Sequence, residues 1–304
     1  MNAIKTILVL LLFVHVTGLQ AAKLPIHPDD LKIIKQIVAH EKLDAAPEVS
    51  PKGWPKLDAP ITVRFKQKDF LRHALTVGCD KDGRVTQLVG NGPLLGNDAL
   101  GWIAGLPELY KIRIDHNIPK PKSGVLHELY DGSGFAALKN SKLTEVKIGH
   151  AFNDNGMKAL AHIASLKVIN IGHSKVTNTG IAALANHPNI VDASFSPMGS
   201  PKVTNKTLVT LSTLPKLQHI GMVETFVTYK DGFEHLKKFK GQLKSVNLRQ
   251  SLVLPADLEK LKEDHPGLEV TTSTMKEVAA KPYRRNQLLK WVSKEAAEYL
   301  KANE

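Results

Sequence analysis

A pattern of apolar residues recurs about every 24 residues through the middle of the chain. Each copy reads apolar, two residues, apolar, one residue, apolar, as over residues 143–148 and again over 166–171. The copies begin at residues 85, 109, 143, 166, 190, 217, 243 and 268. A single unit cannot bury its apolar face alone, so several units must stack on a continuous core. This requirement excludes most other architectures and predicts a curved parallel sheet.

The second half of each unit repeats as well. The tripeptide Val-Thr-Asn at 176–178 returns at 203–205, and apolar residues at a three-residue step, such as Ile181 and Leu184, then indicate a short helix. A proline precedes the next strand at Pro107, Pro188, Pro215 and Pro266. Proline stops a helix because it cannot continue the hydrogen-bond ladder. Each unit therefore predicts a strand, a turn and a helix of two or three turns, which together make an α/β fold.

The run from Leu166 to Leu184 resembles a leucine-rich repeat of the ribonuclease-inhibitor-like type, and it is especially similar to repeats of secreted bacterial leucine-rich repeat proteins. The resemblance covers residues 85–270, or about seven units. It implies a solenoid with the sheet on its concave side and helices on its convex side. It also implies a non-enzymatic scaffold that binds a protein. The unit at 109–142 departs by about ten extra residues, and Ala193 stands where a larger apolar residue is usual.

Residues 1–22 have the three parts of a cleavable signal peptide. A basic start is followed by an apolar stretch over 7–16 and then by small residues that end at Ala22. The apolar stretch is too short to span a bilayer, which takes about 20 residues. The sequence therefore predicts a secreted or periplasmic protein with no stable membrane span once the leader is removed.

Two flanking segments are expected to cap the repeats. Residues 23–84 contain a predicted helix at 27–42, a proline-rich linker at 46–60 and strand patterns over 61–79. Residues 271–304 follow the last repeat and carry apolar residues at helical spacing over 288–300. The solenoid core would otherwise be open at both ends, so these segments are predicted to be an N-terminal and a C-terminal cap.

The composition excludes several classes of protein. Cys79 is the single cysteine, so an internal disulfide framework and a cysteine-rich zinc module are both excluded. The net charge of +12 is spread evenly, with +1 over 1–22, +3 over 23–84, +4 over 85–228 and +4 over 229–304. A nucleic-acid-binding protein usually concentrates its charge on one face or in one stretch, so nucleic acid is not a predicted partner.

Three histidines occupy one column of the repeat. His116, His150 and His173 each stand seven residues after the first apolar position of their unit. Adjacent strands lie about 4.8 Å apart, so the imidazoles are predicted to form a line, whereas metal ligands must converge on one point. We therefore expect a polar ladder with no metal and no other cofactor. A hydrolase or metal site around this column ranks third among the functional hypotheses.

Three further motifs have structural interpretations. Residues 80–83, Asp-Lys-Asp-Gly, begin like a calcium-binding loop but lack its later ligands, so a hairpin turn is expected. Cys79 ends an apolar run, which predicts a buried structural thiol. The sequon at 205–207, Asn-Lys-Thr, matters only in a eukaryotic secretory route.

The residues between the buried apolar positions are expected to point out from the concave face. They begin with Gln87, Val89 and Asn91 in the first unit. The predicted protein-binding surface follows and consists of Lys111, Arg113, Asp115, Glu145, Lys147, Asn170, Asp192, His219, Asn247 and Arg249. A polysaccharide or cell-surface binding module with a basic polar face is the alternative. The insertion at 118–133, which includes Leu126 and Tyr130, is a second candidate surface.

Overall fold

The computed structural model describes residues 24–49, 57–67, 70–91, 95–115, 130–197, 202–274, 277, 286 and 294–302. The expected signal peptide at 1–22 lies outside these residues. So do most of the 118–133 insertion, including Leu126, and much of the expected C-terminal cap.

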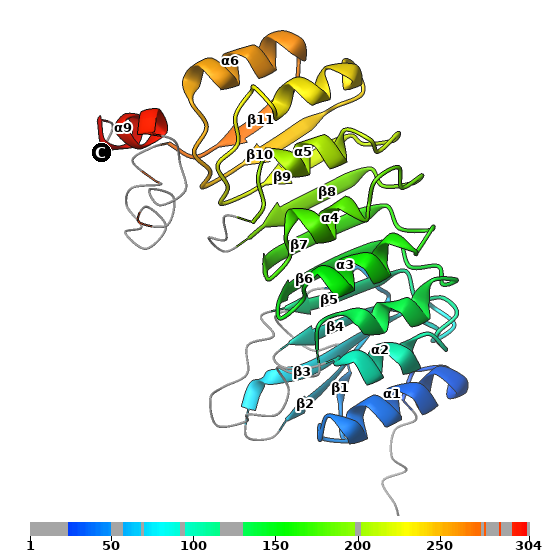
Figure 1. The fold of residues 1–304 in the computed structure, drawn as a ribbon. Coiled ribbons are helices and arrows are strands. Elements are labelled where there is room, and N and C mark those ends of the chain that lie inside the picture. Colours follow the sequence, from blue (N-terminus) through cyan, green and yellow to red (C-terminus); the bar gives the residue numbers. More distant parts are fainter. Residues whose placement is uncertain are drawn as a thin grey trace, which may run out of the picture.

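The described chain forms an α/β fold around one eleven-stranded sheet (Figure 1), and the strands follow the order of the sequence. Strands β1 to β4 pair antiparallel, and every later pair from β4 to β11 is parallel. The strands are β1 Glu48–Val49, β2 Ile61–Gln67, β3 Phe70–Cys79, β4 Val85–Asn91, β5 Lys111–Asp115, β6 Glu145–His150, β7 Val168–Ser174, β8 Asp192–Ser196, β9 His219–Met222, β10 Ser245–Leu248 and β11 Glu269–Thr272. The predicted parallel α/β arrangement is therefore confirmed, and β1 is a short strand inside the segment expected to be a linker.

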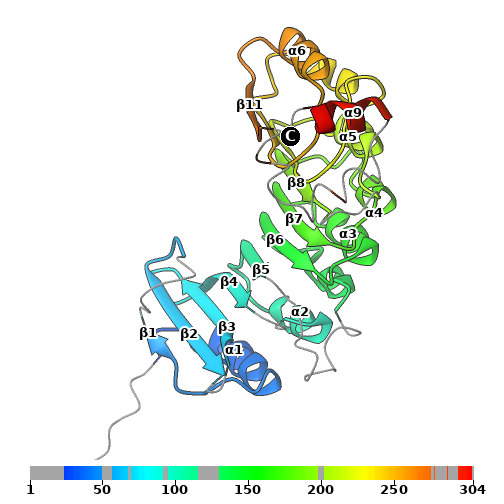
Figure 2. The same ribbon diagram turned by 90° about the vertical axis from the view of Figure 1, so that its left-hand side faces the viewer.

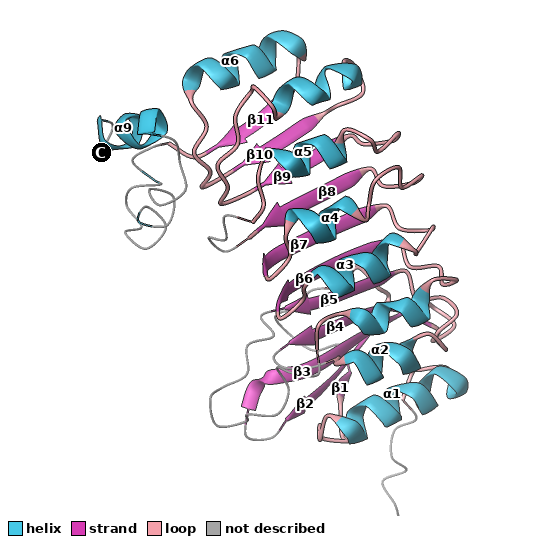
Figure 3. Cartoon of the chain, viewed as in Figure 1, coloured by secondary structure: helices cyan, strands magenta, loops and turns pink. Residues whose placement is uncertain are grey.

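One helix follows each of the strands β4 to β10, and Figure 3 shows the alternation of helix and strand. The helices are α1 Pro28–His40, α2 Asn97–Ile103, η1 Ser133–Leu138, α3 Asp154–Ala161, α4 Asn178–Ala182, α5 Asn205–Leu211, η2 Phe233–Phe239, α6 Pro255–Asp264 and α9 Lys294–Ala302. In Figure 2 the helices α2 to α5 lie on one side of the sheet. We call the opposite side the helix-free face. No helix among the described residues is long and apolar enough to cross a membrane.

Two of the expected α-helices, η1 and η2, are 3₁₀-helices. Helices α3, α4 and α5 each begin after a residue whose side chain accepts a backbone N–H, namely Asn153, Thr177 and Thr204. Helices η1 and η2 follow Gly132 and Gly232, which offer no side-chain cap, but the α-helices α2 and α6 also begin without one, so the cap alone does not set the helix type. An uncapped start leaves backbone N–H groups without intrahelical partners, and short 3₁₀ turns satisfy some of them.

The core lies between the sheet and the helices, where the repeat pattern predicted it. Val146 and Ile169 are fully buried in adjacent strands, and Leu160 and Leu184 pack from the helical side. Fully burying one such side chain contributes roughly 1.5–3 kcal/mol. The exceptional Ala193 is buried in register with Ile169 and Ile220, so the departure from the pattern does not shift the strand.

A ladder of polar side chains joins the helix N-termini of successive units. Asp154 accepts hydrogen bonds from the N–H of Thr177 (2.7 Å) and from its hydroxyl (2.6 Å). The Asn178 amide donates to the Thr204 hydroxyl at 2.9 Å, and one unit later the Asn205 amide donates to the Thr228 hydroxyl at 2.7 Å. We call this series, which begins at Asn97 and Asp131, the capping ladder. It gives the repeated Val-Thr-Asn tripeptide a role between units that the sequence had not indicated.

The capping ladder also removes the glycosylation sequon from consideration as a surface site. The Asn205 amide donates to Thr228 and to the carbonyl of Lys230. Thr207 is fully buried, and its hydroxyl donates to Asn178. An acceptor asparagine must be exposed, so the folded chain does not present this sequon.

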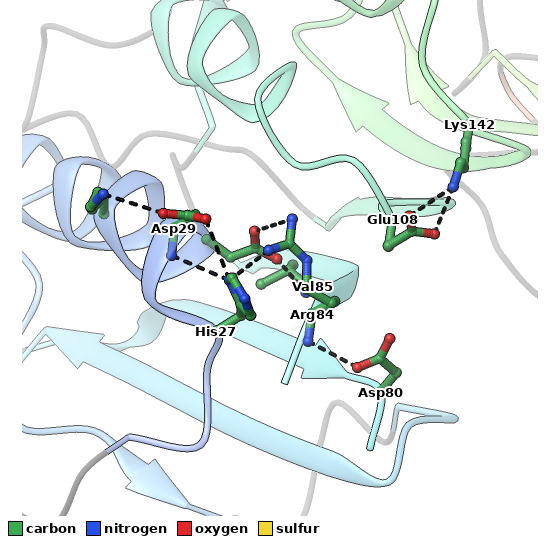
Figure 4. Close-up of polar contacts among 9 residues, drawn as sticks. His27, Asp29, Asp80, Arg84, Val85, Glu108 and Lys142 are labelled. Carbon is green, nitrogen blue, oxygen red and sulfur yellow. Dashed lines mark hydrogen bonds and ion pairs between the residues drawn. The ribbon is translucent and has the colours of Figure 1, made fainter. Parts of the chain in front are cut away.

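The N-terminal segment is attached to the sheet by a buried ion pair. Arg84 contacts the carboxylate of Asp30 at 3.0 Å and donates to His27 Nδ1, and the N–H of Val85 donates to Asp30 at 2.7 Å (Figure 4). These contacts join helix α1 to strand β4. Asp30 is fully buried, so its charge depends on Arg84 for compensation.

The turn between β3 and β4 confirms the hairpin interpretation of residues 80–83. Asp80 accepts hydrogen bonds from the N–H groups of Asp82 and Arg84, both at 2.9 Å, and Gly83 has a φ of +79°. Cys79 is fully buried beside this turn. Burial and the charges of Asp30 and Asp80 raise the pKa of its thiol to about 12, so the side chain stays protonated. The predicted buried structural thiol is confirmed.

Candidate functional site

The parallel register aligns the side chains of the helix-free face in two rows. Row 1 crosses the strands through Lys111, Glu145, Val168, Asp192, His219 and Ser245. Row 2 crosses them through Arg113, Lys147, Asn170, Ser194, Gly221 and Asn247. Eight of the ten residues of the predicted binding surface lie in these rows. Of the other two, Asp115 ends β5 and its side chain lies outside the described part, and Arg249 directly follows β10.

Row 1 contains opposite charges that neutralise one another. Lys111 Nζ lies 2.8 Å from Glu145 Oε1, and His219 Nδ1 lies 2.8 Å from the Ser245 hydroxyl. Burial raises the pKa of the Asp192 carboxyl, His219 acts in the opposite direction, and Glu145 raises it further. Asp192 is therefore the carboxylate of this row that the fold stabilises least.

Row 2 has a different character because it contains no acidic residue. Lys147 is exposed, and Asn170, Ser194 and Asn247 are half-buried. A glycine stands at 221 because a Cβ there would lie 2.0 Å from the Ser194 hydroxyl oxygen. Row 2 is therefore basic at its β5 and β6 end and offers small, uncharged polar groups from β7 to β10.

A third group of residues gathers where strands β7, β8 and β9 end. The Ser196 hydroxyl donates to Glu224 Oε2 at 2.9 Å, and His173 Nε2 lies 3.3 Å from the same oxygen. His173, Glu224 and Gln250 all adopt positive φ angles between 50° and 59°. They stand at the seventh residue after the first apolar position in their units, so the backbone bends at one place in three units.

The predicted histidine ladder is wrong in its register. A bulge at the end of β6 and β7 places Ser174, and not His173, beside His150 in the strand pairing. The side chain of His150 and the whole of His116 lie outside the described part. His173 instead contacts Glu224. Ser196 was missed, although its place at the end of the adjacent strand follows from the repeat spacing.

The first strands of the helix-free face do not offer a binding surface. Thr76, Gln87 and Val89 point to this side, yet each is at most 1% exposed. The Gln87 amide donates to the Asp58 carbonyl and, at 2.8 Å, to the Tyr110 hydroxyl. The segment 57–60 lies over this part of the sheet. The expectation that Gln87 and Val89 point into solvent is therefore wrong.

Residues 130–133 are the only described part of the insertion at 118–133. Tyr130 is 3% exposed, so it belongs to the core and not to a candidate surface. Burial and the neighbouring Asp131 raise the pKa of its phenol. Burial also acts to raise the pKa of Asp131, but hydrogen bonds from Asn155, Ser133 and Asn97 outweigh it and lower the pKa to about 2.

Comparisons with known proteins name no relative. No family model matches the sequence, and a search of curated proteins finds no match. Within the described residues, no group of three or more histidine, cysteine, aspartate or glutamate side chains could hold a metal ion. Functional interpretation therefore depends on the geometry of the helix-free face.

Proposed function

We propose that the chain is a leucine-rich repeat solenoid that serves as a non-enzymatic scaffold and binds a protein on its helix-free face. The observation that carries this proposal is the change in burial along that face. Gln87 on strand β4 is covered, whereas Lys147 and Asn170 on strands β6 and β7 are accessible. A surface of aligned polar side chains on a rigid sheet suits binding better than catalysis, because the described residues of rows 1 and 2 do not bring a nucleophile, a base and oxyanion donors together.

The partner we propose is a protein, met outside the cytosol. The signal-peptide pattern at 1–22 supports a secreted or periplasmic location. The binding surface we propose runs from β6 to β10 and includes Asn170, Asp192 and His219.

The test is affinity capture from the native secretory compartment with a variant that blocks the helix-free face. Asn170→Trp with Asn247→Trp places two bulky side chains over row 2. Lys158→Trp with Lys262→Trp is the matched control, since both lysines are exposed on helices. The proposal expects the partner to be lost from the first variant and kept by the second. A partner that binds both variants equally would place the interface elsewhere, and thermal unfolding would verify that both variants are folded.

A further inference from the structure

The helix-free face leaves two cations without a charge partner. Lys147 and Arg249 are both exposed, and neither makes an ion pair with any residue that the structure describes. The other lysine of this region, Lys111, is already paired with Glu145 at 2.8 Å. The nearby acidic residues contact other groups: Glu145, two residues before Lys147, pairs with Lys111, and Glu224, whose N–H donates to the Arg249 carbonyl at 3.2 Å, contacts Ser196 and His173 with its carboxylate.

The two cations stand at opposite ends of the accessible surface. Lys147 is on β6, and Arg249 directly follows β10, so four strand spacings separate them, or about 19 Å at about 4.8 Å each. Arg249 lies in the turn at 249–250 that follows β10, two residues after Asn247 of row 2, so it stands where this strand ends. A ligand that reaches both cations must therefore be elongated and must cross the strands.

Hydrogen-bond donors lie between the two cations. The Asn247 side-chain oxygen accepts the N–H of Arg249 at 3.1 Å, so its amide NH₂ is left for another acceptor. Asn170 and Ser194 are half-buried, and no hydrogen bond of their side chains is found among the described residues. Gly221, on β9, has no side chain that would project from this part of row 2. Carbonyl and carboxylate oxygens are the complementary groups.

We propose that the partner presents an extended acidic peptide that lies across strands β6 to β10. One carboxylate contacts Lys147, a second contacts Arg249, and backbone carbonyls between them accept hydrogen bonds from Asn170 and Asn247. An extended chain advances about 3.3 Å per residue, so the two acidic residues are about six positions apart. This inference rests on the proposed function and adds the chemistry and the length of the bound segment.

The test is selection of random decapeptides on the immobilised full chain at low salt. The proposal expects enrichment of peptides in which two Asp or Glu residues are five to seven positions apart. Lys147→Glu with Arg249→Glu should weaken binding of a selected peptide by about tenfold or more, because two exposed ion pairs become repulsive contacts. The same affinity should fall as salt is raised, since exposed charges are screened.

A matched variant separates local recognition from net charge. Lys158→Glu with Lys262→Glu changes the net charge by the same amount on the helical side, and it should leave the selected peptides bound. The proposal is overturned if no acidic pair is enriched, if the acidic residues show no preferred spacing, or if both variants weaken binding equally.

The selection also distinguishes failure of this inference from failure of the proposed function. Selected peptides without an acidic pair that are lost from the Asn170→Trp, Asn247→Trp variant would preserve the face as the binding surface and refute the acidic ligand. Selected peptides that bind this variant unchanged would refute both.

Discussion

The first strands of the sheet and the strands from β6 to β10 use the same face in opposite ways. On β3 and β4 the side chains of the helix-free face are buried, and Gln87 bonds to the Asp58 carbonyl of the segment 57–60. On β6 to β10 the equivalent positions are accessible, and their polar groups are only partly satisfied. The difference teaches that one sheet can be core at one end and surface at the other, according to what the flanking chain covers.

A buried charge tests this comparison with the largest expected effect. Val89→Asp introduces a carboxylate where the side chain is 1% exposed, and it should lower the free energy of unfolding by about 3–5 kcal/mol. Asn170→Asp makes a similar change on the accessible part of the same face and should cost no more than about 0.5 kcal/mol. Urea unfolding measures both. Equal losses would show that the two regions do not differ in burial.

Removing one cation from each region should give a smaller contrast. Arg84→Ala leaves the buried carboxylate of Asp30 without its ion pair, and we expect a loss of about 3 kcal/mol. Lys111→Ala removes the partner of Glu145, which is partly solvated, and we expect less than about 1 kcal/mol. The two midpoints of urea unfolding give the comparison, and a Lys111 effect as large as the Arg84 effect would contradict it.

The capping ladder, by contrast, passes through both regions. Removing one of its hydrogen bonds should therefore cost a similar free energy of unfolding in each region. Asn97 bonds to Asp131 at 3.0 Å, and Asn178 bonds to Thr204 at 2.9 Å. We expect Asn97→Ala and Asn178→Ala each to cost about 1–2 kcal/mol, because each leaves part-buried partners unsatisfied. Lys206→Ala on an exposed helical position is the control and should be neutral. A large difference between the two asparagine variants would show that the ladder is not uniform.

The smallest effects concern pH. Hydrogen bonds lower the pKa of Asp131 to about 2, below its value in the unfolded chain, so its stabilisation is complete above about pH 4 and is lost as the pH falls toward 2. Asp131→Asn should therefore cost about 1 kcal/mol at pH 7, and the deficit should shrink between pH 4 and pH 2.

Burial raises the pKa of Asp192, so Asp192→Asn should stabilise the fold at pH 7 and lose that advantage in acid. Urea unfolding across pH checks both, and changes of the same sign at pH 7 would refute this account.

The sequence predicted the parallel α/β arrangement because the repeat pattern is local and recurs in every unit. The strand positions followed from Val146, Ile169 and their equivalents, which are buried as expected. The helix type in two units was not predicted, because the apolar three-residue step is the same for a short α-helix and a 3₁₀-helix, and a missing cap is shared by η1, η2, α2 and α6.

The candidate site was predicted less completely, for two physical reasons. Alternation along a strand tells which side a residue faces, so the ten proposed surface residues could be named, but it does not tell what covers that side. The exposure of Gln87 was therefore predicted wrongly, because the segment 57–60 covers it and the strand pattern does not show this. The contact of His173 with Glu224 was missed because a bulge shifts the register by one residue, which the apolar pattern does not record.

The capping ladder has a direction, and that direction has a consequence for synthesis of the chain. The first helical side chain of a unit, such as Asn178 or Asn205, bonds to the threonine before the next unit's helix, 26 or 23 residues later. A unit emerging from the ribosome cannot complete these bonds until its successor is made. At about 5–20 residues per second, that delay is roughly one to five seconds per unit. Assembly should therefore advance from the N-terminal cap, with the newest unit always incompletely joined.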